Sequence, residues 1–193
     1  LSKWSLLFFS AVLLCLGLTA WYVSDYEDYK ITGSEWLTNP NFTQGLEGWK
    51  KSNNAQVKQE NSGEVTLSSP VSGKYVALYQ RVNIPSNVSL PTQNTDLTSE
   101  KPPLLLQLSG FAQTREIEKG KKAWHRGNLA LVFYNKSGKR RITHSVPLPF
   151  GNSEWAYYKA VFEVPPEVHS IRANVHISQV AGTVQIKRLS LVP

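Results

Sequence analysis

The chain divides into one long apolar run and a later series of short alternating segments. Residues 5–23 carry no charged side chain, and a run of about 20 apolar residues is long enough to cross ~30 Å of hydrocarbon as an α-helix. Aromatic residues that favour the lipid headgroup level bracket this run, and these are Trp4, Trp21 and Tyr22. We therefore predict a transmembrane anchor in residues 1–23, with these three side chains at the membrane interface.

Charges on either side of the apolar run indicate its direction. Lys3 precedes the run, whereas three of the four residues at 25–28 are acidic. Basic residues favour the cytoplasmic side, so we expect a single-pass protein of the inner (cytoplasmic) membrane whose C-terminal domain is periplasmic or extracellular. A cleaved signal peptide is the alternative, but Leu18 is too bulky for a small-x-small cleavage motif ending at Ala20.

Beyond a polar tether at residues 24–35, the pattern is typical of β-structure. Short segments rich in β-branched and aromatic residues alternate with Gly, Pro, Ser and Asn turns. The predicted strands are 65–67, 75–82, 104–113, 128–134, 157–164, 170–178 and 183–192. The absence of an amphipathic helical pattern after residue 30 favours an all-β fold, an antiparallel sandwich or barrel, for the single domain at 36–193.

The clearest alternation lies near the C-terminus. Ile171, Ala173, Val175 and Ile177 occupy every second position, and successive side chains of a strand point to opposite faces. We therefore expect these four residues in the core and the polar residues between them on a candidate binding face. By contrast, residues 86–103 are rich in Ser, Thr, Asn and Pro and lack periodicity, which predicts an insertion loop.

The segment from Leu37 to Trp49 reads LTNPNFTQGLEGW. It resembles the opening strand and turn of galactose-binding-like jelly rolls, especially carbohydrate-binding modules of the family 4 and 9 type. This resemblance implies an antiparallel jelly-roll β-sandwich and a concave polar sheet face able to bind a glycan. Independently of the family, Phe42 and Trp49 suit a core layer, and Gly45 and Gly48 permit the tight turn between them.

One part of the family pattern is altered. Related modules often place acidic residues just after the Phe and in the last strand, where they contribute to a structural calcium site. Thr43 and Lys187 stand at the matching positions here. Calcium requires carboxylate or carbonyl oxygens, so we expect no metal at this site.

Catalytic motifs are missing from the sequence. The four histidines lack metal-ligand spacing, and no HExxH, P-loop or GxSxG motif is present. The only cysteine, Cys15, lies within the predicted anchor, which excludes an intrachain disulfide. We therefore predict a protein that is not an enzyme and has no cofactor.

Positive charge is concentrated in one window. Residues 119–141 contain eight Lys or Arg and no acidic residue, in a chain of net charge +7. Because two clusters flank the predicted strand 128–134, we expect two separate patches that contact lipid headgroups or an acidic partner, and nucleic acid is not expected. The predicted contact residues are Lys121, Lys122, Trp124, Arg126, Lys139, Arg140 and Arg141.

Two functions follow from these observations. The first is a non-catalytic accessory or structural subunit of a membrane protein complex, with membrane lipids and other integral-membrane subunits as partners. The alternative is a membrane-anchored carbohydrate-binding module that recognises a glycan of the cell envelope or the exterior. The residues we assign to the glycan-binding face are Gln107, Tyr134, Tyr157, Arg172, Asn174 and His176.

Overall fold

The computed structural model describes residues 33–60, 63–85, 88 and 103–193. The predicted anchor with Trp4, Trp21 and Tyr22, most of the tether and most of the 86–103 loop lie outside these residues, so the predictions made for them stay predictions. Within the described ranges there is no α-helix. A helix long and apolar enough to span a membrane is accordingly not found in this part of the chain.

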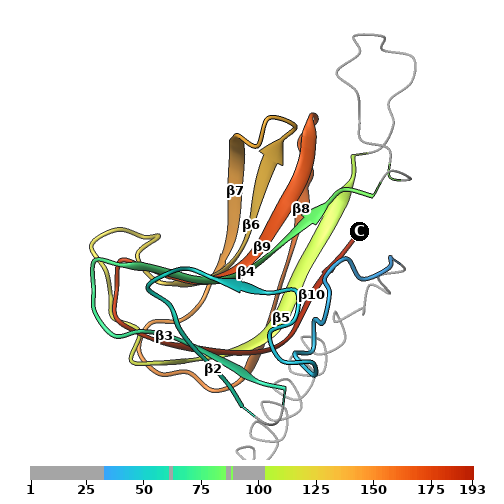
Figure 1. Cartoon of the computed structure of the whole chain (residues 1–193). Coiled ribbons are helices and arrows are strands. Elements are labelled where there is room, and N and C mark those ends of the chain that lie inside the picture. The colour runs from blue at the N-terminus through green and yellow to red at the C-terminus, as the bar shows by residue number, and fades with distance from the viewer. Residues whose placement is uncertain (1–32, 61–62, 86–87, 89–102) are drawn as a thin grey trace, which may run out of the picture. The chain divides into compact units, whose positions relative to one another are not determined.

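Residues 33–193 form one unit built from two five-stranded antiparallel sheets (Figure 1). We call them sheet A and sheet B. In spatial order, sheet A contains β1 (Lys50–Lys51), β4 (Tyr75–Asn83), β9 (Val168–Ser178), β6 (Gly127–Asn135) and β7 (Arg140–Pro147). Sheet B contains β2 (Gln56–Gln59), β3 (Val65–Ser69), β10 (Gly182–Val192), β5 (Leu105–Arg115) and β8 (Ala156–Glu163).

The all-β prediction is confirmed. Each of the seven predicted strands overlaps an observed one, from β3 to β10, whereas β1, β2 and β7 were not predicted. The first two are very short. In β7 every residue except two is exposed, so this strand lacks the apolar alternation that identifies the others.

The two sheets bury an apolar core between them, to which the opening segment contributes two aromatic side chains. Phe42 is fully buried, and its ring centre lies 5.1 Å from that of Trp49. Gly45 and Gly48 adopt φ angles of 70° and 78°, a region that is costly for residues with a side chain. The predicted turn, which brings both rings into one layer, is therefore observed.

Gly48 also lies against a pair of hydrogen bonds that joins this turn to sheet A. The Thr38 amide donates to Gln80 Oε1 (2.6 Å), and Gln80 Nε2 donates to the Thr38 carbonyl (2.9 Å). A Cβ at position 48 would approach Gln80 Nε2 to 2.9 Å and the Thr38 Cβ to 3.1 Å. Glycine at 48 thus allows the close approach as well as the turn.

Replacing Gly48 by Ala tests this double requirement. Gly73→Ala is the matched control, because Gly73 has a similar φ of 80° but a Cβ added there would have no neighbouring atom within 4 Å. Both variants incur a left-handed backbone cost of about 1 kcal/mol. We expect Gly48→Ala to lose about 1–2 kcal/mol more, because the clash displaces Gln80. Equal losses in denaturant unfolding would contradict this explanation.

Candidate functional site

Strand β9 lies at the centre of sheet A and separates the core from a polar surface. Ile171, Ala173, Val175 and Ile177 are fully buried in the core, as the sequence alternation predicts. Their neighbours in sequence point to the opposite face, where sheet A is hollowed. The polar face predicted from β9 is therefore present.

A groove with a volume of about 770 Å³ runs over this outer face of sheet A. Strands β4, β6, β7 and β9 supply most of its surface, and the loop before β6 supplies Trp124. The lining residues are Tyr75, Trp124, Asn128, Val132, Arg140, Arg141, Ile142, Thr143, Ser145, Arg172, Asn174, His176 and Ser178. Aromatic, amide, hydroxyl and guanidinium groups thus share one surface.

The register of the strands orders these groups along the groove. Asn128 pairs with His176, and Tyr134 pairs with both Ser170 and Arg140. The two pairs are six residue steps apart along β6, which corresponds to roughly 20 Å. The groove therefore has an aromatic and amide end near Trp124 and an arginine end near Arg140.

A β-bulge shapes the arginine end. Phe133 pairs with Ile142, but the next residue, Tyr134, pairs with Arg140, so Arg141 is an extra residue in β7. Such bulges bend a strand and re-aim its side chains. Arg140, Arg141 and Ile142 all line the groove, although consecutive residues of a regular strand would point to opposite faces.

The groove floor holds a row of buried polar side chains. Asn174 and His176 are 1% and 9% exposed. Asn128 Nδ2 lies 3.3 Å from His176 Nε2, and Asn174 Nδ2 lies 3.2 Å from His176 Nδ1. Asn174 Oδ1 is buried without a hydrogen-bond partner among the described residues. An unpaired buried polar atom is costly, so this oxygen is an unused acceptor within the described part of the chain.

Burial also determines the protonation states in the floor. It lowers the pKa of His176 to about 4, assisted by the positive charge of Arg172, so this imidazole is neutral at neutral pH. Burial raises the pKa of Tyr75, against the opposing effect of Arg172, so its phenol stays protonated. The Tyr75 and His176 rings lie 5.2 Å apart. Both groups offer uncharged hydrogen-bonding atoms.

Arg172 projects from β9 between two tyrosines. Its Cζ lies 5.1 Å from the Tyr79 ring centre and 5.8 Å from the Tyr134 ring centre. The guanidinium of Arg81 covers Tyr134 at 4.5 Å. Tyr134 therefore lies on the predicted face, but its ring already contacts two arginines and is not a free stacking platform.

The six predicted glycan-binding residues do not share one face. Arg172, Asn174 and His176 line the groove, and Tyr134 lies beside Arg172. Gln107 and Tyr157 are on β5 and β8 in sheet B, so their assignment to the same face is wrong. Alternation along a strand separates its two faces but does not reveal to which sheet the strand belongs.

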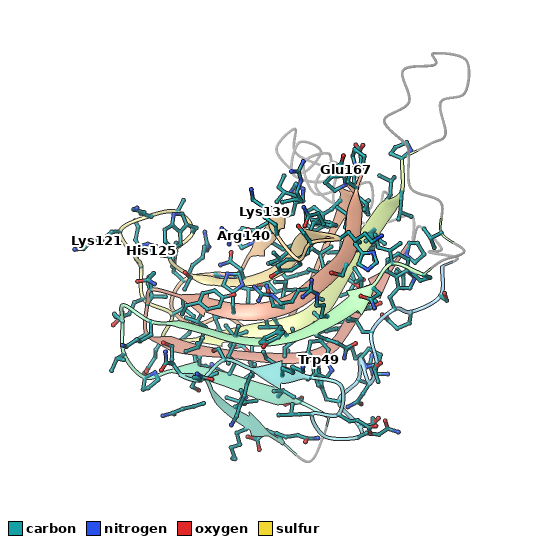
Figure 2. The ribbon with its side chains drawn as sticks, turned by 45° about the horizontal axis from the view of Figure 1, so that its top comes forward. Trp49, Lys121, His125, Lys139, Arg140 and Glu167 are labelled. Atoms are coloured by element: carbon teal, nitrogen blue, oxygen red, sulfur yellow. The ribbon has the colours of Figure 1, made fainter. Side chains whose placement is uncertain are left out.

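The two predicted basic clusters flank β6, and only the second supplies cations to the groove. Trp124 and Arg140–Arg141 lie at opposite ends of β6 as expected, yet they line one groove. Lys121, Lys122 and Lys139 are exposed, and Figure 2 shows Lys121 and His125 at one end of the domain, away from Lys139. Lys121 and Lys122 are not part of the groove lining, so the two sets of cations stay separate and Trp124 is the residue of the first cluster that reaches the groove.

Arg126 has a structural role instead of a surface one. Its Nε and Nη2 donate to the Leu148 carbonyl at 3.0 and 2.6 Å, and its Cζ lies 4.1 Å from the Phe150 ring centre. These contacts hold the segment before β6 against the segment after β7. Arg126 is therefore not a free contact residue, contrary to the sequence-based expectation.

Several groove residues were missed by sequence reasoning. They are Tyr75, Asn128, Val132, Ile142, Thr143 and Ser145. Ser178 also lines the groove, as the polar alternation of β9 predicts. The six missed residues become visible only through the pairing of β9 with β4 and β6 and of β6 with β7. Identifying them required knowledge of which residues pair across neighbouring strands, and the sequence does not contain this in readable form.

The surroundings of Lys187 show how sheet B accommodates a lysine at the position where the resemblance led us to consider a calcium ligand. Its Nζ lies 3.3 Å from Glu64 Oε1 and 4.1 Å from the Trp155 ring centre. Among the described residues, no three His, Cys, Asp or Glu side chains come together as a metal site. The lysine thus neutralises Glu64 by an ion pair.

Comparison with known proteins finds no matching family model and no matching curated protein. Solved structures do match. The enzymatically active domain of bacteriophage CBA120 tailspike protein 4 has 16% identity and a TM-score of 0.59 over 82% of this chain, which spans only 21% of that chain. A family 16 carbohydrate-binding module has 14% identity and a TM-score of 0.54, with 82% of this chain and 99% of the module covered.

A family 4 carbohydrate-binding module matches with 9% identity and a TM-score of 0.53, over 81% of this chain and 99% of the module. At such identities the likeness shows the fold alone. The β-sandwich of the carbohydrate-binding modules, which the opening segment led us to expect, is therefore confirmed.

The buried His176 predicts a stability loss in acid. Its folded pKa of about 4 lies below an unfolded value near 6.5, so the unfolded chain binds the extra proton between these pH values. Stability should fall by up to about 3 kcal/mol from this group as pH decreases from about 6.5 to about 4. His176→Gln should lack this contribution in urea unfolding, whereas His169→Gln, at an exposed position of the same strand, should retain it. An unchanged pH slope in His176→Gln would refute the prediction.

Proposed function

We propose that the domain is a carbohydrate-binding module and that the sheet A groove is its binding site. The observation that carries the proposal is the composition of the groove, which combines exposed aromatic rings with buried amide and hydroxyl groups. Sugars present apolar C–H faces and polar hydroxyls, so their binding sites need both kinds of group. The fold shared with family 4 and 16 modules supports the proposal.

Two aromatic side chains are placed to contact a sugar. Tyr75 is 39% exposed and Trp124 is 53% exposed, and both line the groove. Lys122 Nζ lies 5.5 Å from the Trp124 ring centre, and His125 contacts that ring edge-on at 4.1 Å. Between them, Asn128 and Ser178 offer hydrogen-bonding groups along the floor.

Binding without catalysis is the proposed role. Glycoside hydrolysis commonly uses a pair of carboxyl groups on either side of the scissile bond. Among the described residues that line the groove, none is an aspartate or glutamate. The groove is therefore suited to holding a sugar chain without the carboxyl pair that such hydrolysis uses.

We further propose that residues 5–23 hold this module at a membrane, with the domain on the exported side. This part depends on the sequence alone. The subunit hypothesis, in which the domain belongs to a larger membrane complex, stays a prediction, and the groove makes the glycan-binding alternative the stronger of the two.

Tyr75 and Tyr157 provide a matched test of the groove. They are 39% and 40% exposed, on sheet A and sheet B respectively. In affinity electrophoresis of the 193-residue chain against neutral and acidic soluble polysaccharides, we expect Tyr75→Ala to weaken binding about tenfold through the lost ring contact. Tyr157→Ala should change it less than twofold. Equal effects, or no binding by the unaltered chain, would overturn the proposal.

Deletion of residues 5–23 tests the anchor. The intact chain should stay in the membrane fraction after alkaline carbonate extraction, because about 20 apolar residues make insertion effectively irreversible. The deleted form should be released while keeping the same near-ultraviolet circular dichroism. Release of the intact chain would show that residues 5–23 do not span the bilayer.

A further inference from the structure

We infer that the groove selects an acidic polysaccharide, whose carboxylate groups bind at the arginine end. This inference rests on the proposed function, because it names the class of sugar chain that the same groove takes. Three arginines line the groove, namely Arg140, Arg141 and Arg172. Neutral sugars require no such concentration of cations.

Arg172 is the clearest sign of a missing anion. It is only partly exposed, and its Nε is buried without a hydrogen-bond partner among the described residues. Its guanidinium lies near the rings of Tyr79 and Tyr134 and near no carboxylate that forms an ion pair with it in the described part of the chain. A partly buried cation without a counter-ion is unfavourable. A ligand carboxylate would supply the counter-ion and could accept from two N–H groups at once.

Arg140 and Arg141 add two cations at the same end of the groove. The β7 bulge directs both side chains toward the groove. The two ion pairs found among the described residues are Lys58–Glu60 and Lys187–Glu64, so neither arginine is neutralised within this part of the chain. Glu167, in the turn before β9, is labelled in Figure 2 and does not belong to the groove lining.

The remaining groove chemistry favours an acidic sugar chain over other anions. A lipid headgroup would need the cations on a surface that can lie flat on a bilayer, whereas these line a recess together with Tyr75, Asn128 and Ser145. A single-stranded nucleic acid would need aromatic platforms in succession with a cationic track beside them. Here Trp124 lies toward one end, Arg140 and Arg141 lie toward the other, and Tyr75 is close enough to Arg172 and Arg140 for their charges to act on its phenol. Two exposed rings without a further aromatic succession fit a chain of hydroxyl-rich units with carboxylates.

The test compares oligosaccharides that differ only in charge. Oligogalacturonate, oligoguluronate and hyaluronan oligosaccharides are titrated into the 193-residue chain by isothermal calorimetry, each beside its own methyl ester, which removes the charge and keeps the sugar. We expect at least one acid to bind about tenfold or more tightly than its ester. Raising NaCl from about 50 to about 500 mM should weaken the binding of the acid but not the binding of the ester.

Charge-matched variants locate the effect. The double variant Arg140→Gln/Arg141→Gln should lose at least about tenfold in affinity for the acid and leave ester binding unchanged. The control Arg115→Gln/Arg188→Gln also removes two positive charges, but from strands β5 and β10 of sheet B. It should change neither the affinity for the acid nor the affinity for the ester. Arg172→Lys keeps the positive charge but loses the paired N–H donors of the planar guanidinium, so it should also weaken binding of the acid.

The outcomes separate this inference from the proposed function. Equal affinity for acid and ester would overturn the inference and leave a neutral-glycan module standing. If none of the acids, esters or neutral polysaccharides binds, both the inference and the proposed function are overturned. Binding to phosphatidylglycerol vesicles or to an oligothymidylate that depends on Arg140 and Arg141, with no oligosaccharide bound, would also overturn the inference and would identify a different anionic ligand.

Discussion

The pairing of β9 with β4 on one side and β6 on the other is the constraint on which both the core and the groove depend. Nine residues of β9 pair with β4, and the register continues without a break. A slip by one residue would exchange the two faces, placing Arg172, Asn174 and His176 in the core and Ile171, Ala173 and Val175 in the groove. The energetic penalty of that exchange fixes the register, so core packing also determines the chemistry of the groove floor.

The floor is an unusual place for polar groups. Asn174 and His176 are nearly inaccessible, and their burial is favourable only if most of their hydrogen-bonding atoms find partners. The amides of Asn128 and Asn174 flank the two ring nitrogens of His176. A neutral imidazole has one N–H and one acceptor, so both nitrogens can be satisfied only if one amide presents its oxygen. Either orientation of the Asn174 amide leaves one of its polar atoms without a partner among the described residues.

Arg172 adds a partly buried positive charge to the polar groups of the floor. Its contacts with Tyr79 and Tyr134 offset part of the cost of removing a guanidinium from water, since an aromatic face attracts a cation. They do not replace an anion. The same charge helps to keep His176 neutral, so the amide and imidazole part of the floor stays uncharged while the arginine end stays positive.

The features that depend on local periodicity could be predicted from the sequence, whereas those that depend on strand pairing could not. The alternation at 171–177, the Phe42–Trp49 turn and the seven apolar strands all follow from residues close together in the chain, and the structure contains each of them. Gln107 and Tyr157 were placed on the wrong sheet because β5 pairs with β10 and β8 pairs with β5, and neither strand pairs with β9. The short strands β1 and β2 and the polar strand β7 lack an apolar pattern, and Tyr75 joins the groove only through its pairing with Ser178.

The arginines of β7 have a competing explanation that the central strand does not share. Strand β7 is an edge of sheet A, and charged residues and bulges on edge strands prevent pairing with other chains. Edge protection accounts for cations anywhere on β7, but it does not require them to face the groove. It also does not account for Arg172, which lies on the central strand with a buried, unpaired Nε. Arg140 and Arg141 on the edge strand and Arg172 on the central strand line the same groove. A shared anionic ligand accounts for the positive charge at both places.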